Sequence, residues 1–323
     1  MVPEVAGGTL APRMHALVVT NMYPSPERPA LGSFVRDQVD ALRRIDGVQV
    51  ELFAFAPGGA RAYINAAREL RRRYRAAPYD VVHAHFGLTA WPALAAAGHA
   101  HAVTLHGTDL VHPRSRAITL AALPLLALVA TVSEPLAADI PAWAVRGSQA
   151  VLPTGVDIER FKPLPRAEAR AALGLDPTGR YLLFPADPTR PEKRHDRAVA
   201  TVGETGAELI TLGHVDPAQV PLYVNAANAV LVPSERESFG VAVLEALACD
   251  VPVLATPVGI APNALQDLPG TLCAPFDATL WRTALEPHLT HPDPRIANGR
   301  ARAEPFSTDR MAAQVLAAWQ ALT

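Results

Sequence analysis

The sequence is poor in cysteine and in uninterrupted hydrophobic runs, and each shortage excludes a class of protein. Its two cysteines, Cys249 and Cys273, are too few for a disulfide framework or a cysteine zinc site, so we expect a cytoplasmic protein. The most apolar stretch, residues 118–132, is too short to span a bilayer, and we expect a buried helix followed by a buried strand there. Residues 1–12 lack the pattern of a signal peptide and are expected to form a frayed leader.

Charge is also scarce. Lysine and arginine number 29 against 31 acidic residues, so the net charge of −2 gives no general attraction for nucleic acid, and we expect no nucleic-acid partner. Only 19% of the residues are charged and 50% are hydrophobic, which provides for a large core. A chain of 323 residues favours two domains of about 150 residues each.

Short apolar runs alternate with helical patterns along the chain. Strands are predicted at residues 15–20, 49–55, 81–85, 102–106, 127–132, 181–186, 208–212, 229–232 and 253–256. Helices are predicted at residues 34–44, 61–75, 88–97, 166–173, 192–201, 217–227 and 240–248. This alternation predicts an α/β fold of two doubly wound parallel-sheet domains facing a cleft. Prolines and a glycine interrupt residues 152–165, where we expect the linker between the domains.

Two glutamates lie on either side of a predicted helix start. Glu237 precedes the helix and Glu245 lies inside it, and both carboxylates are suited to accept hydrogen bonds from sugar or ribose hydroxyls. The amides of residues 238–241 open this helix and favour a phosphate. Taken alone, such a pair is better explained as acids that complement the helix dipole, so the spacing by itself is weak evidence.

Cations crowd the start of the helix predicted at residues 192–201. Arg190, Lys193 and Arg194 oppose the helix dipole there unless an anion binds, which indicates a phosphate site. The alternative is a solvated surface on which Glu192 and Asp196 offset the positive charge.

The first half of the chain offers further candidates. His106 follows a predicted strand, at the sheet edge where ligands bind in such folds. Gly32 lies in the loop after the first strand, where it would let the backbone approach a ligand or simply form a turn. His83 and His85 share one face of a strand, which raises the alternative of a metal site completed by His106 or Asp109.

Residues 61–75 are strongly basic. They contain six arginines against one acid, Glu69, with Tyr63, Ile64 and Leu70 between them. The pattern is typical of an amphipathic surface helix, which is either solvated scaffold or a contact for anionic lipid headgroups.

Together these segments resemble the retaining glycosyltransferases of family 4, which have a GT-B fold of two Rossmann-like domains. The likeness spans nearly the whole chain: YPSPERPALGSFVRDQVDAL, VVHAHFG, TLHGTD, VATVSEPLA, LPTGVDIERF, PEKR and ERESFGVAVLEALACDVPVLATPVG. In the last segment, Glu237 and Glu245 match the family's paired-glutamate motif.

The resemblance implies roles for individual residues. It assigns the reaction centre to His106, Glu237, Lys193 and Arg190, and donor binding to Gly32, Ser238, Phe239, Gly240, Val241 and Glu245. Pro188 stands at the family's usual arginine position, so Arg190 takes that role here. The implied domains are an acceptor-side domain at 1–155, a donor-binding domain at 156–305, and a helix within 306–323 that returns to the first domain.

The implied reaction moves a sugar from a nucleotide diphosphate sugar to an acceptor hydroxyl, with retention and with neither metal nor cofactor. GDP-mannose, UDP-glucose and UDP-N-acetylglucosamine remain open as donors, and a glycan, a lipid-linked molecule or a small molecule as acceptor. The alternatives are an epimerase or phosphorylase of the same architecture, a histidine-based metallohydrolase, and a binding subunit without turnover. A cytoplasmic location is expected, with contact to the inner face of the membrane through residues 61–75 as a further hypothesis.

Overall fold

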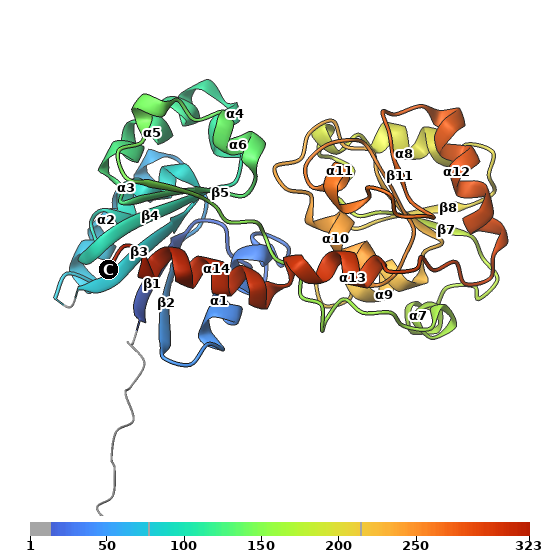
Figure 1. Ribbon diagram of the computed structural model, residues 1–323, viewed down its shortest axis with the longest axis horizontal. Coiled ribbons are helices and arrows are strands. Elements are labelled where there is room, and N and C mark those ends of the chain that lie inside the picture. The colour runs from blue at the N-terminus through green and yellow to red at the C-terminus, as the bar shows by residue number, and fades with distance from the viewer. Residues whose placement is uncertain (1–13, 77, 214) are drawn as a thin grey trace, which may run out of the picture.

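The chain forms two α/β lobes, each built on one parallel sheet (Figure 1). The computed structural model describes residues 14–76, 78–213 and 215–323. The expectation of a frayed leader at residues 1–12 lies outside these ranges. Two parallel sheets of this kind confirm the predicted α/β class.

The first lobe contains a six-stranded sheet in the order β2-β1-β3-β4-β5-β6. Its strands are β1 (Met14–Thr20), β2 (Val48–Ala54), β3 (Tyr79–His85), β4 (Gly98–Leu105), β5 (Leu128–Thr131) and β6 (Ser148–Val151). Its helical segments are α1 (Ser33–Arg43), α2 (Ala60–Arg73), η1 (Gly87–Thr89), α3 (Ala90–Ala93), α4 (Thr108–Val111), α5 (Pro113–Ala122), η2 (Leu123–Leu125), α6 (Glu134–Ala138) and η3 (Ala142–Ala144). The inner strands are almost wholly buried because helices cover both faces of the sheet.

The second lobe contains a five-stranded sheet in the order β11-β10-β9-β7-β8. Its strands are β7 (Tyr181–Phe184), β8 (Glu208–Thr211), β9 (Ala229–Val232), β10 (Val253–Ala255) and β11 (Leu272–Cys273). The helical segments that follow the linker are α7 (Arg166–Leu173), η4 (Pro191–Lys193), α8 (His195–Val202), α9 (Val220–Ala226), α10 (Val241–Ala248), α11 (Ala261–Ala264), α12 (Ala278–Thr290), α13 (Gly299–Ala303), η5 (Glu304–Phe306) and α14 (Thr308–Gln320).

Two predicted helices differ from the structure. The helix expected at residues 88–97 is a 3₁₀ turn and a four-residue helix that ends at Ala93, and β4 begins at Gly98, before the predicted strand at residues 102–106. The helix expected from residue 192 begins at His195, because Arg194 adopts a left-handed backbone (φ 56°) that interrupts it. Lys193 therefore lies in a separate 3₁₀ turn ahead of α8.

The chain crosses between the lobes twice, and the two crossings are hydrogen-bonded to each other. The Val156 amide donates to the Phe306 carbonyl at 2.8 Å, and the Thr308 amide donates to the Val156 carbonyl at 3.0 Å. A Cβ atom on Gly155 would lie 2.8 Å from the Thr308 Cα, so this close approach requires glycine.

Helix α14 packs beside α1 on the first lobe (Figure 1). Trp319 is fully buried, and its indole N–H donates to His83 Nδ1 at 2.8 Å. Arg44 and Asp309 add an ion pair of 2.7 Å. The last helix is thus bound to the lobe that the first strands form. Across the described ranges, no helix is long and apolar enough to cross a membrane.

Candidate functional site

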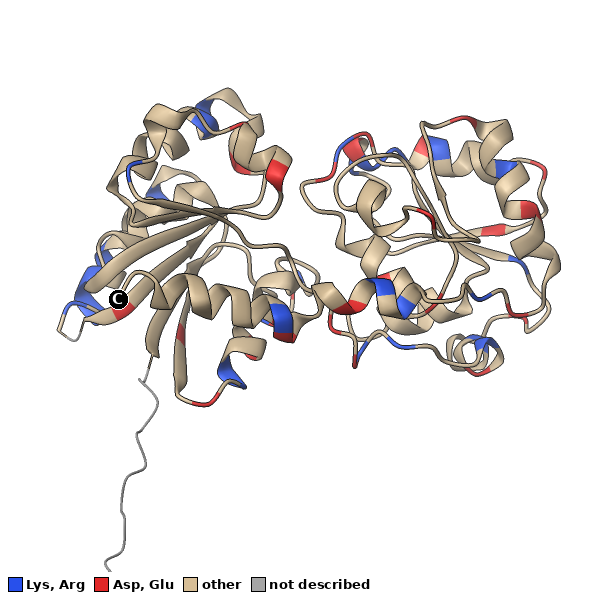
Figure 2. Cartoon of the chain, viewed as in Figure 1, with Lys and Arg blue, Asp and Glu red and all other residues tan. Residues whose placement is uncertain are grey.

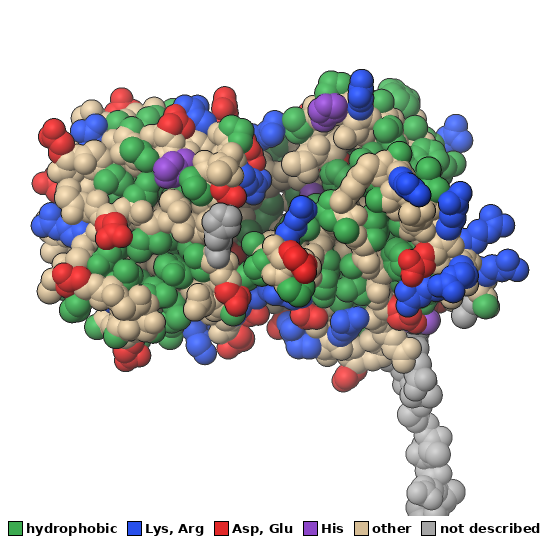
Figure 3. All heavy atoms as spheres, turned by 180° about the vertical axis from the view of Figure 1, so that it is seen from behind, with side chains coloured by type: hydrophobic (Ala, Val, Ile, Leu, Met, Phe, Trp, Pro, Cys, Tyr) green, Lys and Arg blue, Asp and Glu red, His purple; other side chains and the backbone are tan. Residues whose placement is uncertain are grey.

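The predicted site residues follow the carboxyl ends of strands in both lobes. His106 comes directly after β4, and Glu237 lies in the loop between β9 and α10. Lys193 lies in the segment after β7, and Gly32 ends the loop after β1. Parallel sheets bind ligands outside these strand ends. Figure 3 shows a furrow where the two lobes meet.

An ion pair between Lys193 and Glu237 holds the second-lobe part of the site together. Lys193 Nζ donates to both carboxylate oxygens of Glu237 at 2.7 Å, and Ser234 Oγ donates to Oε1 at 2.7 Å. The side chains are only 17% and 10% exposed. An ammonium has three N–H donors, so Lys193 keeps one for a further acceptor.

The loop after Glu237 presents unused backbone amides. Within the described chain, none of four consecutive amides donates a hydrogen bond: those of Ser238, Phe239, Gly240 and Val241. Gly240 has φ 90° and caps α10, so these amides lie at the positive end of a helix. Gly259 supports the loop closely, since a Cβ there would lie 2.9 Å from Glu237 Cβ. Such an arrangement binds anions.

Glu245 is a carboxylate without a protein partner. Its side chain makes no hydrogen bond or ion pair with any residue that the structure describes. Burial raises the pKa of Glu245 to about 7, although Arg160 lowers it and Asp37 raises it slightly further. A half-buried carboxylate without donors is costly, and the hydroxyl donors of a ligand would satisfy it.

The two lobes touch at this site. A Cβ on Gly107 would lie 2.2 Å from Ser238 Oγ. Gly107, which follows β4 of the first lobe, is therefore in contact with the loop before α10 in the second lobe. In the first lobe, the rings of Phe34 and His106 lie 4.8 Å apart. This contact places the helix that starts after Gly32 next to His106.

A second contact between the lobes runs through the linker. Arg160 donates to both oxygens of Asp37 on α1, at 3.2 and 2.5 Å. Arg160 also acts electrostatically on Glu245 in α10. The spacing of the sequence gave no signal for this pair, although both residues lie in segments that carry the family resemblance.

The arginines of the cationic cluster do not share the environment of Lys193. Arg190 is 52% exposed and pairs with Glu192 at 2.7 Å, and Arg194 pairs with Asp196 at 2.7 Å. Neighbouring acids offset the charge of these two arginines, and a role of Arg190 in anion binding stays a prediction. These pairs are compatible with the alternative of a solvated surface on which Glu192 and Asp196 offset the positive charge.

Gly32 is explained by its own chain. Its φ is 65°, and a Cβ would lie 2.1 Å from the Met22 carbonyl oxygen. The missing side chain therefore makes room for the Met22 backbone, and the approach of a ligand to Gly32 stays a prediction.

The histidines of the alternative metal site are engaged by protein partners. His83 binds Trp319 through Nδ1 and Thr104 through Nε2, both at 2.8 Å. His85 binds Gln38 and His106 with its two ring nitrogens, both at 3.1 Å. Among the residues described, no group of three histidine, cysteine, aspartate or glutamate side chains is arranged to hold a metal ion.

Comparison with known families matches both lobes. The family "Glycosyltransferase Family 4" matches residues 10–160, and "Glycosyl transferases group 1" matches residues 192–301. The architecture is that of GT-B glycosyltransferases. Sucrose-phosphate synthase of Thermosynechococcus elongatus superposes with a TM-score of 0.73 at 20% identity, covering 95% of this chain and 99% of that one. HepE of Anabaena, solved with UDP and glucose, superposes with a TM-score of 0.69 at 15% identity, covering 95% and 100%.

Sequence relatives identify the family more narrowly. D-inositol 3-phosphate glycosyltransferase of Actinosynnema mirum is 31% identical over 328 residues, covering 81% of this chain and 77% of the relative. The same enzyme of Segniliparus rotundus is 32% identical over 209 residues, covering 53% and 46%. The matches span about half the length of most such relatives. The chain belongs to glycosyltransferase family 4.

The environment of Glu245 predicts a measurable gain in stability from its neutralisation. Because the folded-state pKa is raised, the folded protein holds this proton more tightly than the unfolded chain, and stability is lost as pH rises from about 4.5 through 7. Glu245→Gln should therefore raise the free energy of unfolding at pH 8 by about 1–3 kcal/mol, with little effect at pH 4.5. Urea unfolding at both pH values measures this, with Glu286→Gln on the exposed face of α12 as control. Equal or lower stability of Glu245→Gln at pH 8 would contradict the assignment.

Proposed function

We propose that the protein transfers a sugar from a nucleotide diphosphate sugar to an acceptor hydroxyl, with retention at the anomeric carbon and without a metal. The observation that carries the proposal is the juxtaposition on α10 of the unpartnered Glu245 with four free amides, beside Lys193. A nucleotide diphosphate sugar offers hydroxyl donors to Glu245 and phosphate oxygens to the amides and to Lys193.

The proposal gives each group a distinct role. Glu245 accepts hydrogen bonds from the ribose hydroxyls, and Glu237 contacts the transferred sugar. The spare N–H of Lys193 and the amides of residues 238–241 bind the diphosphate. His106 contacts the sugar from the first lobe. Arg190 would reach the diphosphate only by leaving Glu192, so Lys193 carries most of this role.

The reaction then proceeds on one face of the sugar. The bond between the anomeric carbon and the diphosphate oxygen breaks, and its electron pair stays on the diphosphate. The acceptor oxygen bonds to the same face of the carbon, and its proton passes to the departing phosphate oxygen. Lys193 and the helix-terminal amides stabilise the charge that develops on the leaving group.

In this proposal residues 1–155 hold the acceptor and residues 156–305 hold the donor. The contact between Gly107 and Ser238 supports a reaction at the junction of the lobes, where closure excludes water. The similarity to the D-inositol 3-phosphate glycosyltransferase of Actinosynnema mirum supports a phosphorylated inositol as the first acceptor to test. The UDP and glucose bound to HepE support UDP-glucose as the first donor.

Donor binding is the most direct test of the site. We expect one nucleotide sugar in a panel to raise the Tm, and calorimetry to show at least about tenfold weaker binding to Lys193→Ala and to Glu245→Ala, since each removes a charge-assisted contact. Lys162→Ala and Glu286→Ala, at exposed positions, are matched controls. Unchanged affinity in both site variants would refute the site assignment.

Product analysis tests the chemistry. With the preferred donor and acceptor, we expect NMR to find the anomeric configuration of the donor in the product. Turnover should be unchanged in EDTA, because protein groups supply the leaving-group stabilisation. An inverted product, or activity that is lost in EDTA and restored by a divalent cation, would refute the corresponding part of the proposal.

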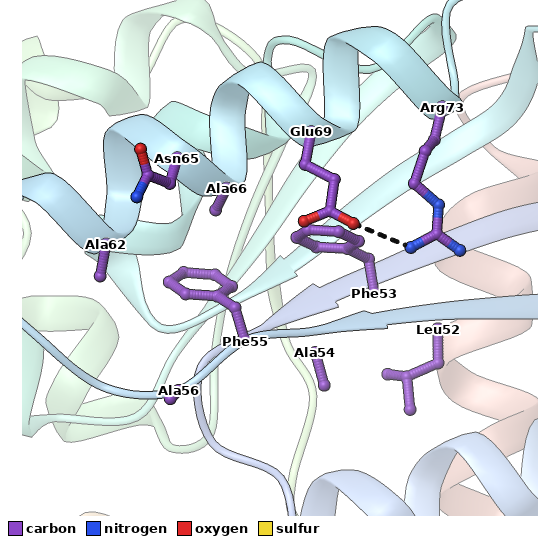
Figure 4. Close-up of a pocket in the computed structure, with 10 residues that line it drawn as sticks. All are labelled: Leu52, Phe53, Ala54, Phe55, Ala56, Ala62, Asn65, Ala66, Glu69 and Arg73. Carbon is purple, nitrogen blue, oxygen red and sulfur yellow. Dashed lines mark hydrogen bonds and ion pairs between the residues drawn. The ribbon is translucent and has the colours of Figure 1, made fainter.

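We further propose that α2 contacts anionic membrane lipids. All six arginines at residues 61–75 are exposed. Most of them lie in the second half of α2 and directly after it, where Figure 2 shows a concentration of basic residues. A cavity of about 330 Å³ lies between β2 and α2 (Figure 4). Phe53, Phe55 and Ala66 line its apolar part, and Glu69 and Arg73 form an ion pair of 3.1 Å at its edge. Cations beside an apolar cavity suit the headgroup and chain of an anionic lipid.

Vesicle binding tests this contact. The parent protein should sediment with phosphatidylglycerol vesicles and not with phosphatidylcholine vesicles, because each basic residue near an anionic surface contributes about 1 kcal/mol. Replacing Arg68, Arg71 and Arg72 by glutamate should abolish sedimentation. The same triple change at Arg180, Arg282 and Arg310, exposed elsewhere, should not. Equal binding of both triple variants would refute the contact.

A further inference from the structure

Three histidine rings form a continuous stack behind the site. His83 and His85 lie 5.0 Å apart at 14°, and His85 and His106 lie 5.3 Å apart at 21°. The first two rings are fully buried on β3, and His106 is half-buried at the end of β4. The stack thus leads from the core beneath α14 to the junction of the lobes.

Hydrogen bonds divide the stack into two independent parts. His83 Nδ1 accepts from the Trp319 indole, so the His83 proton lies on Nε2 and points to Thr104 Oγ1. His83 makes no hydrogen bond with His85 within the described chain. This part attaches α14 to β3 and has no route to His106.

The second part begins at Gln38, a buried residue of α1. Its amide nitrogen lies 3.1 Å from His85 Nε2 and, as a donor, makes that nitrogen an acceptor. The His85 proton must then lie on Nδ1, which is 3.1 Å from His106 Nε2. His106 Nε2 is in turn an acceptor, so the His106 proton lies on Nδ1. That nitrogen has no hydrogen-bond partner among the described residues.

The neutral form of these rings is favoured throughout. Burial lowers the pKa of His85 to about 4 and lowers the pKa of His106 well below its usual value. At neutral pH the position of the single proton on each ring therefore decides which ring nitrogen donates and which accepts.

We propose that Gln38, acting through His85, is a positioning residue that fixes His106 as a hydrogen-bond donor through Nδ1 at the lobe junction. The substrate atom that it meets is an oxygen of the transferred sugar, and this part rests on the proposed function. Gln38 itself touches no substrate. Because Gln38 and His85 belong to different elements, the tautomer depends on how α1 packs against β3.

The proton positions are measured without turnover. Long-range ¹H–¹⁵N spectra of ¹⁵N-histidine-labelled protein should place the protons on Nδ1 of His85 and of His106. Gln38→Glu, which can only accept, should move both to Nε2. Gln38→Leu, which has no polar group, should leave a mixture at His106. Trp319→Phe is the matched control: it removes the hydrogen bond to His83 and should leave His106 unchanged.

Kinetics supply the second reading. Gln38→Leu should lower kcat by about tenfold with the donor KM within about threefold, and Trp319→Phe should change neither. A His106 proton on Nε2 in the parent, or one that Gln38→Glu does not move, overturns the relay even where transfer is observed. The predicted proton positions in a protein that transfers no sugar would refute the proposed function and leave the relay standing.

Discussion

The hydrogen-bonded crossing of the chain at Val156 determines how the two lobes face each other. Val156 in the outgoing linker donates a hydrogen bond to the Phe306 carbonyl and accepts one from the Thr308 amide in the returning segment. The two segments lie so close that a Cβ on Gly155 would be 2.8 Å from the Thr308 Cα. Every contact between the lobes at the site, including that between Gly107 and Ser238, presupposes this crossing.

The linker also carries charge across the junction. Arg160 lies four residues beyond Val156 and binds Asp37 of α1, while its field reaches Glu245 of α10. The pair of Arg160 and Asp37 is half-buried, so it is stronger than a surface ion pair and more costly to separate. A rotation of the lobes that moved α1 would therefore also change the electrostatic environment of Glu245.

Much of the fold could be predicted from prolines and glycines that begin and end helices. Helix α7 lies between Pro165 and Gly174, and the structure has it at the predicted residues because both ends are encoded locally. The start of α8 could not be predicted in this way. Arg194 adopts a positive φ that sequence pattern assigns to glycine or asparagine, and its ion pairs with Asp196 and Glu235 accompany that conformation. Strand β6 was not predicted because it is an edge strand whose first two residues, Ser148 and Gln149, are polar and exposed.

The candidate site likewise has a part that the sequence predicts and a part that it does not. Glu237 and Glu245 lie on one continuous loop and helix, so their spacing in the sequence predicts that they belong to one site. The basic segment that contains Lys193 can be recognised from the sequence in the same way. The pairings of Asp37 with Arg160 and of Gln38 with His85 join residues separated by 123 and 47 positions. Nothing in local sequence specifies such partners; only the packing of α1 against the linker and β3 does.

The charged groups of the site differ in how far the protein itself satisfies them, and this difference is its clearest functional signal. Lys193 and Glu237 neutralise each other, and Arg190 and Arg194 have acidic neighbours. Glu245 and the amides at the start of α10 are left without partners although they are partly withdrawn from water. A fold optimised only for stability would replace Glu245 by a neutral residue. Retaining it sacrifices stability for a carboxylate that hydroxyl donors of a ligand can satisfy, whereas the free amides suit the negatively charged oxygens of a ligand.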